Sequence, residues 1–278
     1  MSHDSTALVL GGGGLAGIGW TIGALAALEE SGSLRLDTVD HVIGTSAGAA
    51  VAAAVLQAGA ARVEYDRVVR KWRRNDELAP AVALTDVMPE ILAVHGSEDS
   101  LAAKTRRFMQ LSHERSGTEP SRRRDAVAQR VAEDSWPSDR FSVTAVRGDG
   151  SRSVFTSTSG VGLVDALTAS CAVPGLWPVV AIGEENYIDG ATFSATNAEL
   201  AQDADRVIVL RPMPELPAYA SEERQEVLDR AVVIEPSERA RAGFGADPFD
   251  PDVRGVAAVL GYEDGLAAVP SVRRLLER

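Results

Sequence analysis

The stretch that most constrains the fold of this chain is residues 44–48, which read G-T-S-A-G. An apolar run directly before it predicts a short buried strand, and an alanine-rich run after it predicts a helix. A serine at the apex of a tight turn between a strand and a helix is the arrangement of a nucleophile elbow. Gly44 and Gly48 lack the side chains that would block such a turn, so Ser46 is predicted to be a nucleophile. The alternative is an ordinary strand–helix turn that carries a small residue.

No histidine occupies the C-terminal position from which a histidine activates the serine in α/β-hydrolases. A serine hydroxyl is a poor nucleophile until a base takes its proton, and α/β-hydrolases place serine, acid and histidine in that order along the chain. The last histidine of this chain is His113, so none stands near the C-terminus. His41 lies within the predicted strand before Ser46, where a structural role is expected. The base is therefore sought among the carboxylates.

Asp189 is the carboxylate in the most informative position. It follows a predicted short strand at 186–188 and precedes Gly190, and folds with parallel sheets keep their chemistry at strand ends. An aspartate acts directly as a base when burial raises its pKa toward the working range. The alternative is that the Asp-Gly pair is only a turn signal.

A glycine-rich loop forms the third candidate feature. The predicted strand at 8–10 runs into residues 11–17, G-G-G-G-L-A-G, and a helix follows. The backbone N–H groups of such a loop converge on an anion. One reading is an oxyanion hole for the tetrahedral intermediate of acyl transfer. The other is a dinucleotide site, because Gly12, Gly14 and Gly17 fit the pattern G-x-G-x-x-G.

The position of the acidic residues favours the oxyanion hole. A dinucleotide site of this type requires an acidic residue at the end of the second strand, where it holds the ribose. Here that strand ends in the glycine and threonine before Ser46, whereas Asp37 and Asp40 lie at or before its start. Neighbouring parallel strands would also carry the glycine loop and Ser46 to one edge of the sheet.

Four segments together resemble the patatin-like phospholipase family. They are residues 12–17 (G-G-G-L-A-G), 44–48, 169–179 (A-S-C-A-V-P-G-L-W-P-V) and 189–191 (D-G-A), in this order. The resemblance extends over most of residues 6–210. It implies a serine acyl hydrolase with a Ser-Asp dyad on a three-layer α/β/α fold around a mostly parallel sheet. The remaining alternatives are a nucleotide-binding oxidoreductase and a binding protein that kept the fold and lost turnover.

The resemblance also assigns roles to single residues. Ser46 would be the nucleophile, Asp189 the base, and the backbone of Gly12, Gly13 and Gly14 the oxyanion hole. The supporting glycines would be Gly17, Gly44, Gly48 and Gly190. Many members carry arginine or lysine in the glycine loop where this chain has Ala16, which removes a fixed cation near the developing oxyanion. The expected substrate is a lipid or another ester, and no cofactor is expected.

The chain is expected to form a single domain over residues 1–278. Helices predicted at 62–74, 80–94, 101–113 and 121–133 interrupt the strand–helix alternation, and we interpret residues 62–135 as a helical cap inserted over the site. The cap is also the expected place for any peripheral membrane contact. Its large apolar side chains are candidates for lining an acyl pocket, with core packing expected for most: Trp72, Met88, Ile91, Leu92, Phe108 and Met109. The arginine run 122–124 is interpreted as a solvated helix start, with lipid phosphates as the alternative partner.

Beyond the cap, the pattern predicts hairpins, further strands and a long helix. The hairpins are expected at 141–147 with 152–156 and at 179–182 with 186–188, a helix at 163–171, strands at 206–210 and 232–235, and a helix at 252–276 with weak points at Gly261 and Pro270.

The composition limits which classes of partner the protein is expected to bind and where in the cell it is expected to be. The net charge of −12 and the lack of a basic field argue against nucleic acid. One cysteine and four scattered histidines give no metal-ligand spacing. Cys171 lies in an apolar segment and is expected to be a packed, inert thiol. No signal peptide and no membrane-spanning run are visible, so a cytoplasmic location is expected.

Overall fold

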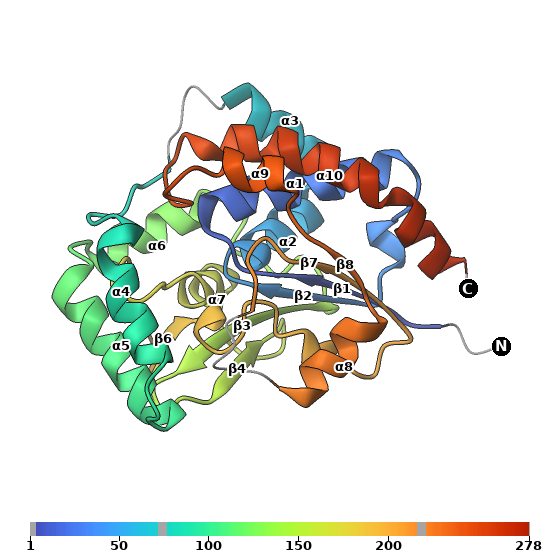
Figure 1. The fold of residues 1–278 in the computed structure, drawn as a ribbon. Coiled ribbons are helices and arrows are strands. Elements are labelled where there is room, and N and C mark those ends of the chain that lie inside the picture. Colours follow the sequence, from blue (N-terminus) through green and yellow to red (C-terminus); the bar gives the residue numbers. More distant parts are fainter. Residues whose placement is uncertain (1–3, 72–76, 216–220, 278) are drawn as a thin grey trace.

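A central β-sheet organises the computed structural model, which describes residues 4–71, 77–215 and 221–277 (Figure 1). Within these residues the sheet has eight strands in the order β5-β6-β3-β2-β1-β7-β8, with β4 paired to β3. The strands are β1 Thr6–Leu10, β2 His41–Thr45, β3 Phe141–Arg147, β4 Arg152–Phe155, β5 Val180–Ile182, β6 Glu185–Asp189, β7 Arg206–Leu210 and β8 Val232–Ile234. The pairs among β3, β2, β1, β7 and β8 are parallel, whereas β4, β5 and β6 pair antiparallel.

Helices cover both faces of the sheet and form the outer layers (Figure 1). One face carries α1 Gly14–Glu30, α2 Ala47–Ala58, α3 Ala61–Lys71, α7 Leu163–Ser170, α9 Glu238–Gly243 and α10 Val253–Leu276. The other carries the short helix η3 Ala198–Ala201 and α8 Glu222–Arg230. The helices α4 Leu84–His95, α5 Leu101–Arg115 and α6 Pro120–Ala128 lie at the end of the molecule near β6. This arrangement confirms the three-layer α/β/α fold with a mostly parallel sheet.

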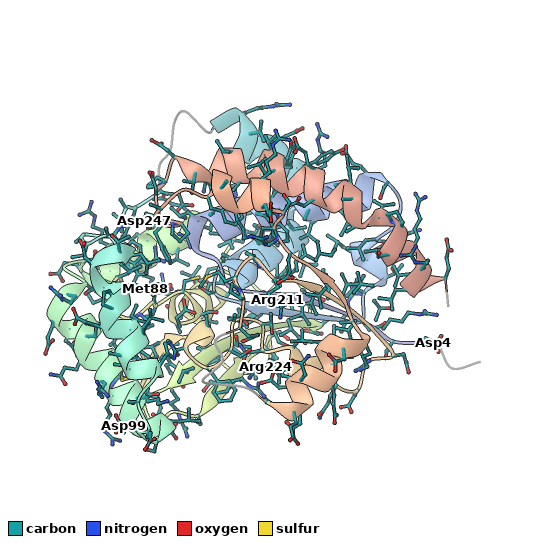
Figure 2. All side chains as sticks on the ribbon, in the orientation of Figure 1. Asp4, Met88, Asp99, Arg211, Arg224 and Asp247 are labelled. Carbon is teal, nitrogen blue, oxygen red and sulfur yellow. The ribbon has the colours of Figure 1, made fainter. Side chains whose placement is uncertain are left out.

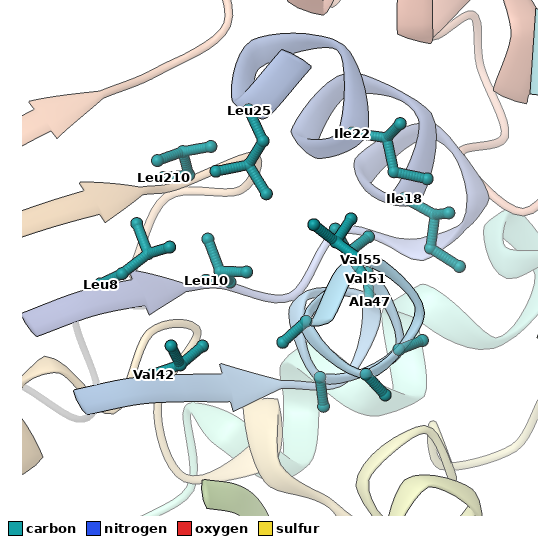
Figure 3. Close-up of a cluster of buried hydrophobic side chains, with 14 of the residues drawn as sticks. Leu8, Leu10, Ile18, Ile22, Leu25, Val42, Ala47, Val51, Val55 and Leu210 are labelled. Carbon is teal, nitrogen blue, oxygen red and sulfur yellow. The ribbon is translucent and has the colours of Figure 1, made fainter. Parts of the chain in front are cut away.

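The alternation of side chains along the strands separates the two apolar layers. Leu8 and Leu10 of β1 face α1 and α2 together with Val42 and Leu210 (Figure 3). Ala7 and Val9 point to the opposite face, toward η3 and α8. Because both of their faces are buried, the central strands β1 and β7 are apolar at nearly every position, which is typical of a parallel sheet. Each leucine removed from water in this way stabilises the fold by about 2 kcal/mol.

The opposite layer is also held by a buried ion pair. Arg224 of α8 donates through Nε to Glu199 of η3 at 2.9 Å, and both side chains are buried. Figure 2 shows Arg224 on the α8 side of the sheet, away from Met88 of α4. Breaking such a pair on one side leaves an uncompensated buried charge, so this contact fixes α8 against the chain that follows β6.

The long helix α10 is continuous through Gly261 and Pro270, which corrects the predicted weak points. A β-carbon at Gly261 would lie 2.1 Å from the carbonyl oxygen of Trp20 in α1, and one at Gly23 would lie 2.0 Å from that of Ala258 in α10. The two glycines therefore allow the backbones of α1 and α10 to touch. Pro270 lies on the exposed side of the helix. None of the described helices is long and apolar enough to cross a membrane.

Most predicted elements are present with shifted ends. The helices predicted from 62, 80, 101 and 121 correspond to α3, α4, α5 and α6, although α6 ends at Ala128 rather than at 133. Both hairpins, the helix α7 and the strands β7 and β8 lie where the sequence predicts them. His41 is exposed at the start of β2, which does not support the structural role expected for it.

Candidate active site

Ser46 occupies a strained turn between β2 and α2. Its backbone angles are φ 53° and ψ −118°, a left-handed conformation that is rare for any residue with a side chain. The glycines around it allow the chain to pass at close range. A β-carbon at Gly48 would lie 2.0 Å from the carbonyl oxygen of Leu10, and one at Gly44 would lie 2.5 Å from the Cα of Ala49. The strand–turn–helix geometry predicted for residues 44–48 is therefore present.

The strand registers bring Asp189 to Ser46. Val143 and Thr144 of β3 pair with both β2 and β4. Ala145 and Val146 of β3 pair with both β4 and β6. Since β4 holds one edge of β3, β2 and β6 share the other edge. The strands β2 and β6 run toward each other along this edge of β3. Thr45 at the end of β2 therefore pairs with Thr144, and Asp189 at the end of β6 pairs with Ala145. Asp189 thus lies at the end of β6, an antiparallel strand of the predicted hairpin, next to the end of the parallel strand β2.

The two side chains form a direct hydrogen bond. The Oγ of Ser46 donates to the Oδ2 of Asp189 at 2.7 Å. Ser46 is 5% exposed and Asp189 is 1% exposed, so the bond is shielded from bulk water. The backbone N–H of Ser46 donates to the Oγ of Ser170 at 2.8 Å. Ser170 belongs to the segment 169–179 that resembles the family, although the sequence assigned it no role, and it holds the elbow against the end of α7.

The environment of Asp189 changes its acidity. Burial raises the pKa of this carboxyl to about 7, while the Ala191 amide, the Ser46 hydroxyl and the Arg123 cation partly oppose the rise. The N–H of Ala191 donates to Oδ1 at 2.8 Å, which orients the carboxyl and leaves Oδ2 for the serine. Gly190 allows this turn, because a β-carbon there would lie 2.6 Å from the carbonyl oxygen of Thr144. A carboxyl with a pKa near neutrality is suited to accept a proton and return it.

The glycine loop lies beside the elbow, and its amides have different partners. Gly12 donates its N–H to the carbonyl oxygen of Ala195 at 2.8 Å. The N–H groups of Gly13 and Gly14 have no acceptor among the residues that the structure describes. A β-carbon at Gly12 would lie 3.5 Å from the β-carbon of Ser46, so the loop and the serine are in contact. A β-carbon at Gly17 would lie 3.3 Å from the β-carbon of Pro212 and 3.5 Å from that of Ala47. Of the three predicted oxyanion donors, Gly13 and Gly14 are therefore the ones left to bind an anion.

A polar network fixes the loop that follows Asp189. Glu215 accepts hydrogen bonds from the amides of Ala195 and Thr196, each at 2.9 Å. Asn197, in a left-handed conformation with φ 54°, donates through Nδ2 to the Oγ1 of Thr45 at 3.1 Å. This network connects Ala195, whose carbonyl oxygen accepts the N–H of Gly12, to β2, the strand that leads to Ser46. The sequence gives no signal for it, because its members are ordinary polar residues far apart in the chain.

An apolar cavity opens next to the Ser46–Asp189 pair. It has a volume of about 120 Å³ and is lined by Ser46 and Asp189 together with side chains of α4, including Met88, Ile91 and Leu92. Three of the six predicted pocket residues are thus correctly placed. Phe108 and Met109 belong to the packed layer under α4 and α5, and Trp72 lies outside the described residues. For comparison, an engineered cavity of roughly 150 Å³ accommodates benzene.

His95 also lines this cavity, at the end of α4. Its ring packs on Phe108 with centroids 4.8 Å apart. Burial, with a further contribution from the nearby Lys104 cation, lowers the pKa of the imidazole to about 4, so the ring is neutral at pH 7. Because the Ser46 hydroxyl donates to Asp189, His95 forms part of the cavity wall and the carboxylate remains the candidate base.

Two further predictions concern Cys171 and Arg123, which line a second, smaller cavity together with Ser46. Cys171 is buried, and burial raises the pKa of its thiol, as expected for a packed, inert cysteine. Arg123 is 2% exposed, which corrects the interpretation of the whole run 122–124 as a solvated helix start. No group of three or more candidate metal ligands occurs among the described residues.

Comparison with known proteins identifies the family of this chain. The family model described as patatin-like phospholipase matches residues 8–201. This chain belongs to the patatin-like phospholipase family. The match includes the glycine loop, the elbow and Asp189, and membership supports a lipid hydrolase activity. No curated protein matches the chain.

Solved structures show the same fold at low sequence identity. VipD from Legionella pneumophila has a TM-score of 0.50 and 14% identity, over 98% of this chain and 67% of that one. The ExoU–SpcU complex of the type III secretion system of Pseudomonas aeruginosa contains a chain with a TM-score of 0.42 and 16% identity, over 98% of this chain and 52% of that one. At these identities the likeness concerns the fold alone, and the second score is too low to carry an argument.

Proposed function

We propose that this protein is a serine acyl hydrolase that cleaves lipid esters with Ser46 as nucleophile and Asp189 as base. The observation that carries the proposal is the buried hydrogen bond of 2.7 Å from the Ser46 hydroxyl to the Asp189 carboxylate. Three further features accompany it: a strained elbow, a carboxyl whose pKa is near 7, and two loop amides that have no acceptor in the described part of the chain.

The reaction begins with proton transfer to Asp189. The carboxylate takes the proton of Ser46, and Oγ attacks the ester carbonyl carbon. The carbonyl oxygen becomes an oxyanion, which the amides of Gly13 and Gly14 stabilise. Each such donor is worth about 3 kcal/mol in the transition state. The intermediate then expels the alcohol, which takes the proton back from Asp189, and the acyl group remains on Ser46.

The second half of the cycle releases the acid. Asp189 takes a proton from water, and the resulting hydroxide attacks the acyl-enzyme carbonyl. The second intermediate collapses with Ser46 as the leaving group, and its oxygen recovers the proton from Asp189. The products are one alcohol and one carboxylic acid, and the enzyme returns to its starting state.

The apolar cavity is the proposed site for the acyl chain. Part of its wall comes from α4, within the segment that we interpret as a cap in a single domain. Leu92 is 50% exposed and Met213 is 38% exposed, and both line the same cavity. Exposed apolar side chains at the edge of such a cavity are suited to contact with a lipid surface, so this edge is the proposed point of peripheral membrane contact.

A panel of esters tests the proposal. The panel contains p-nitrophenyl esters of increasing chain length, a diacylglycerol and a phosphatidylcholine vesicle, each assayed with the wild type and with Ser46→Ala. We expect hydrolysis by the wild type, with a preference for acyl chains long enough to fill the apolar cavity, and none by the variant. Equal hydrolysis by both proteins would contradict the proposal.

A further inference from the structure

Arg123 of α6 is a buried cation that forms no ion pair within the part of the chain that the structure describes. Its guanidinium stacks on Trp177 at 3.7 Å from the ring centroid, and Nη2 lies 3.4 Å from the carbonyl oxygen of Cys171. Nε and Nη1 have no hydrogen-bond partner among the described residues. An uncompensated buried charge is costly, and a purely structural role would be served better by an apolar side chain.

The charges around Arg123 do not neutralise it. Glu77, the nearby glutamate, already forms ion pairs with Arg130, at 2.9 Å, and with Arg254. Three arginines thus share one glutamate. Burial and the neighbouring Arg130 lower the pKa of Arg123 to about 9, which still leaves it positive at pH 7. The other groups that act on it are the carboxyl of Asp189, from β6, and the buried thiol of Cys171, which follows α7.

Arg123 also lies at the reacting centre. It lines a small cavity of about 10 Å³ together with Ser46, Gly14 and Cys171. This space is roughly that of one water-sized sphere, and it is distinct from the apolar cavity although Ser46 and Gly14 border both. The glycine loop supplies no cation here, because residues 11–17 contain only glycine, leucine and alanine. Arg130 also lines this cavity, but it pairs with Glu77 at 2.9 Å.

We propose that Arg123 is an electrostatic residue of the acyl-transfer reaction. Its fixed charge stabilises the negative charge that resides on the Asp189 carboxylate before proton transfer and on the ester oxygen afterwards. Trp177 and the Cys171 carbonyl hold the guanidinium in place without neutralising it. The inference rests on the proposed function, because it concerns the same serine and aspartate.

The test is the pH dependence of the reaction in variants of Arg123. The rate of Ser46 labelling by a fluorophosphonate and the rate of ester hydrolysis are measured from pH 5 to 9. An opposite charge close to a carboxyl lowers its pKa by about one unit or more. In Arg123→Gln the midpoint of the acid limb should therefore move up by about one pH unit, with a roughly tenfold loss of rate below it. Arg123→Lys keeps the charge and should keep a midpoint near that of the wild type.

Arg124→Gln is the matched control, because it removes a neighbouring arginine of the same helix. Arg124 is half exposed and pairs with Asp165 at 2.6 Å and with Asp134 at 3.3 Å. This variant should leave both the midpoint and the rate unchanged, since exposed pairs contribute little.

Two results would overturn the inference. One is an Arg123→Gln protein that loses rate equally at every pH while its midpoint stays in place, which indicates packing alone. The other is a midpoint in Arg123→Lys that moves up by a full unit although the charge is retained, and this result remains informative if Arg123→Gln does not fold. Failure of the proposed function has a separate signature, because Ser46 would then not be labelled even in the wild type.

Discussion

Replacing Asp189 with asparagine should make the protein inactive and, at alkaline pH, more stable. The carboxyl is 1% exposed, and burial raises its pKa from 3.8 to about 7. Below about pH 3 the carboxyl is protonated in both the folded and the unfolded chain. Above pH 7 the folded chain must carry a buried charge that the unfolded chain exposes to water. The stability contributed by the protonated carboxyl is therefore lost as the pH rises through about 7.

The size of this effect follows from the two pKa values. The difference between about 7 and the ordinary 3.8 corresponds to about 4 kcal/mol at 1.36 kcal/mol per pH unit. Asparagine has the same shape and does not ionise, so Asp189→Asn should gain up to about 4 kcal/mol of unfolding free energy at pH 8.5 and only a small fraction of that at pH 4. For a chain of this size the gain corresponds to roughly 8 °C in Tm.

The assay is thermal and urea unfolding of wild type and variant at pH values from 4 to 8.5. Asp149→Asn is the control, because Arg147 and Ser151 hold the pKa of that exposed carboxyl well below its usual range. Its effect on stability should be the same from pH 5 to 8.5. Ester hydrolysis by Asp189→Asn should be lost while substrate binding remains, since an amide cannot accept the serine proton. A stability difference for Asp189→Asn that does not grow with pH would refute the reasoning.

Three further outcomes follow from the packing and from the loop. Gly13→Val should reduce hydrolysis strongly, because a β-carbon there would lie 2.7 Å from the Cβ of Pro212 and would displace the loop amides; activity close to that of wild type would contradict this. Gly261→Val should lower the unfolding free energy by several kcal/mol, since its β-carbon would clash with the Trp20 carbonyl, and Val259→Ala on the exposed face of α10 is the control for urea unfolding. NAD or NADP should leave Tm unchanged, whereas a ligand at 100 times its Kd would add about 2.7 kcal/mol.

The sequence predicts the elbow and the glycine loop well because their signals are local. A serine between glycines, preceded by an apolar run and followed by alanines, defines the strand, the turn and the helix within a few residues. The strands β7 and β8 are similarly clear, since their β-branched runs are short and bounded. Gly13 and Gly14 also follow from local pattern, whereas the hydrogen bond that occupies the Gly12 amide depends on Ala195, far along the chain.

The rest depends on tertiary contacts that no local pattern contains. Asp189 reaches Ser46 because β2 and β6 meet head to head along one edge of β3, and a strand register is invisible in an Asp-Gly pair. Arg123 lies in a run of three arginines that is typical of a solvated surface, but the packing of α6 on Trp177 buries the middle one. The low helix propensity of Gly261 predicts a weak point in the helix. In the structure the same glycine allows the backbone of α10 to contact that of α1.

The measurement that tests the central claim most directly is the site of covalent labelling by a fluorophosphonate. The wild type is labelled, digested and mapped by mass spectrometry, and its ester hydrolysis is followed during the reaction. The account predicts one labelled residue, Ser46, with activity lost in proportion to labelling, and neither labelling nor hydrolysis in a folded Ser46→Ala protein. Labelling of another serine such as Ser170, or hydrolysis that persists in Ser46→Ala, would contradict it.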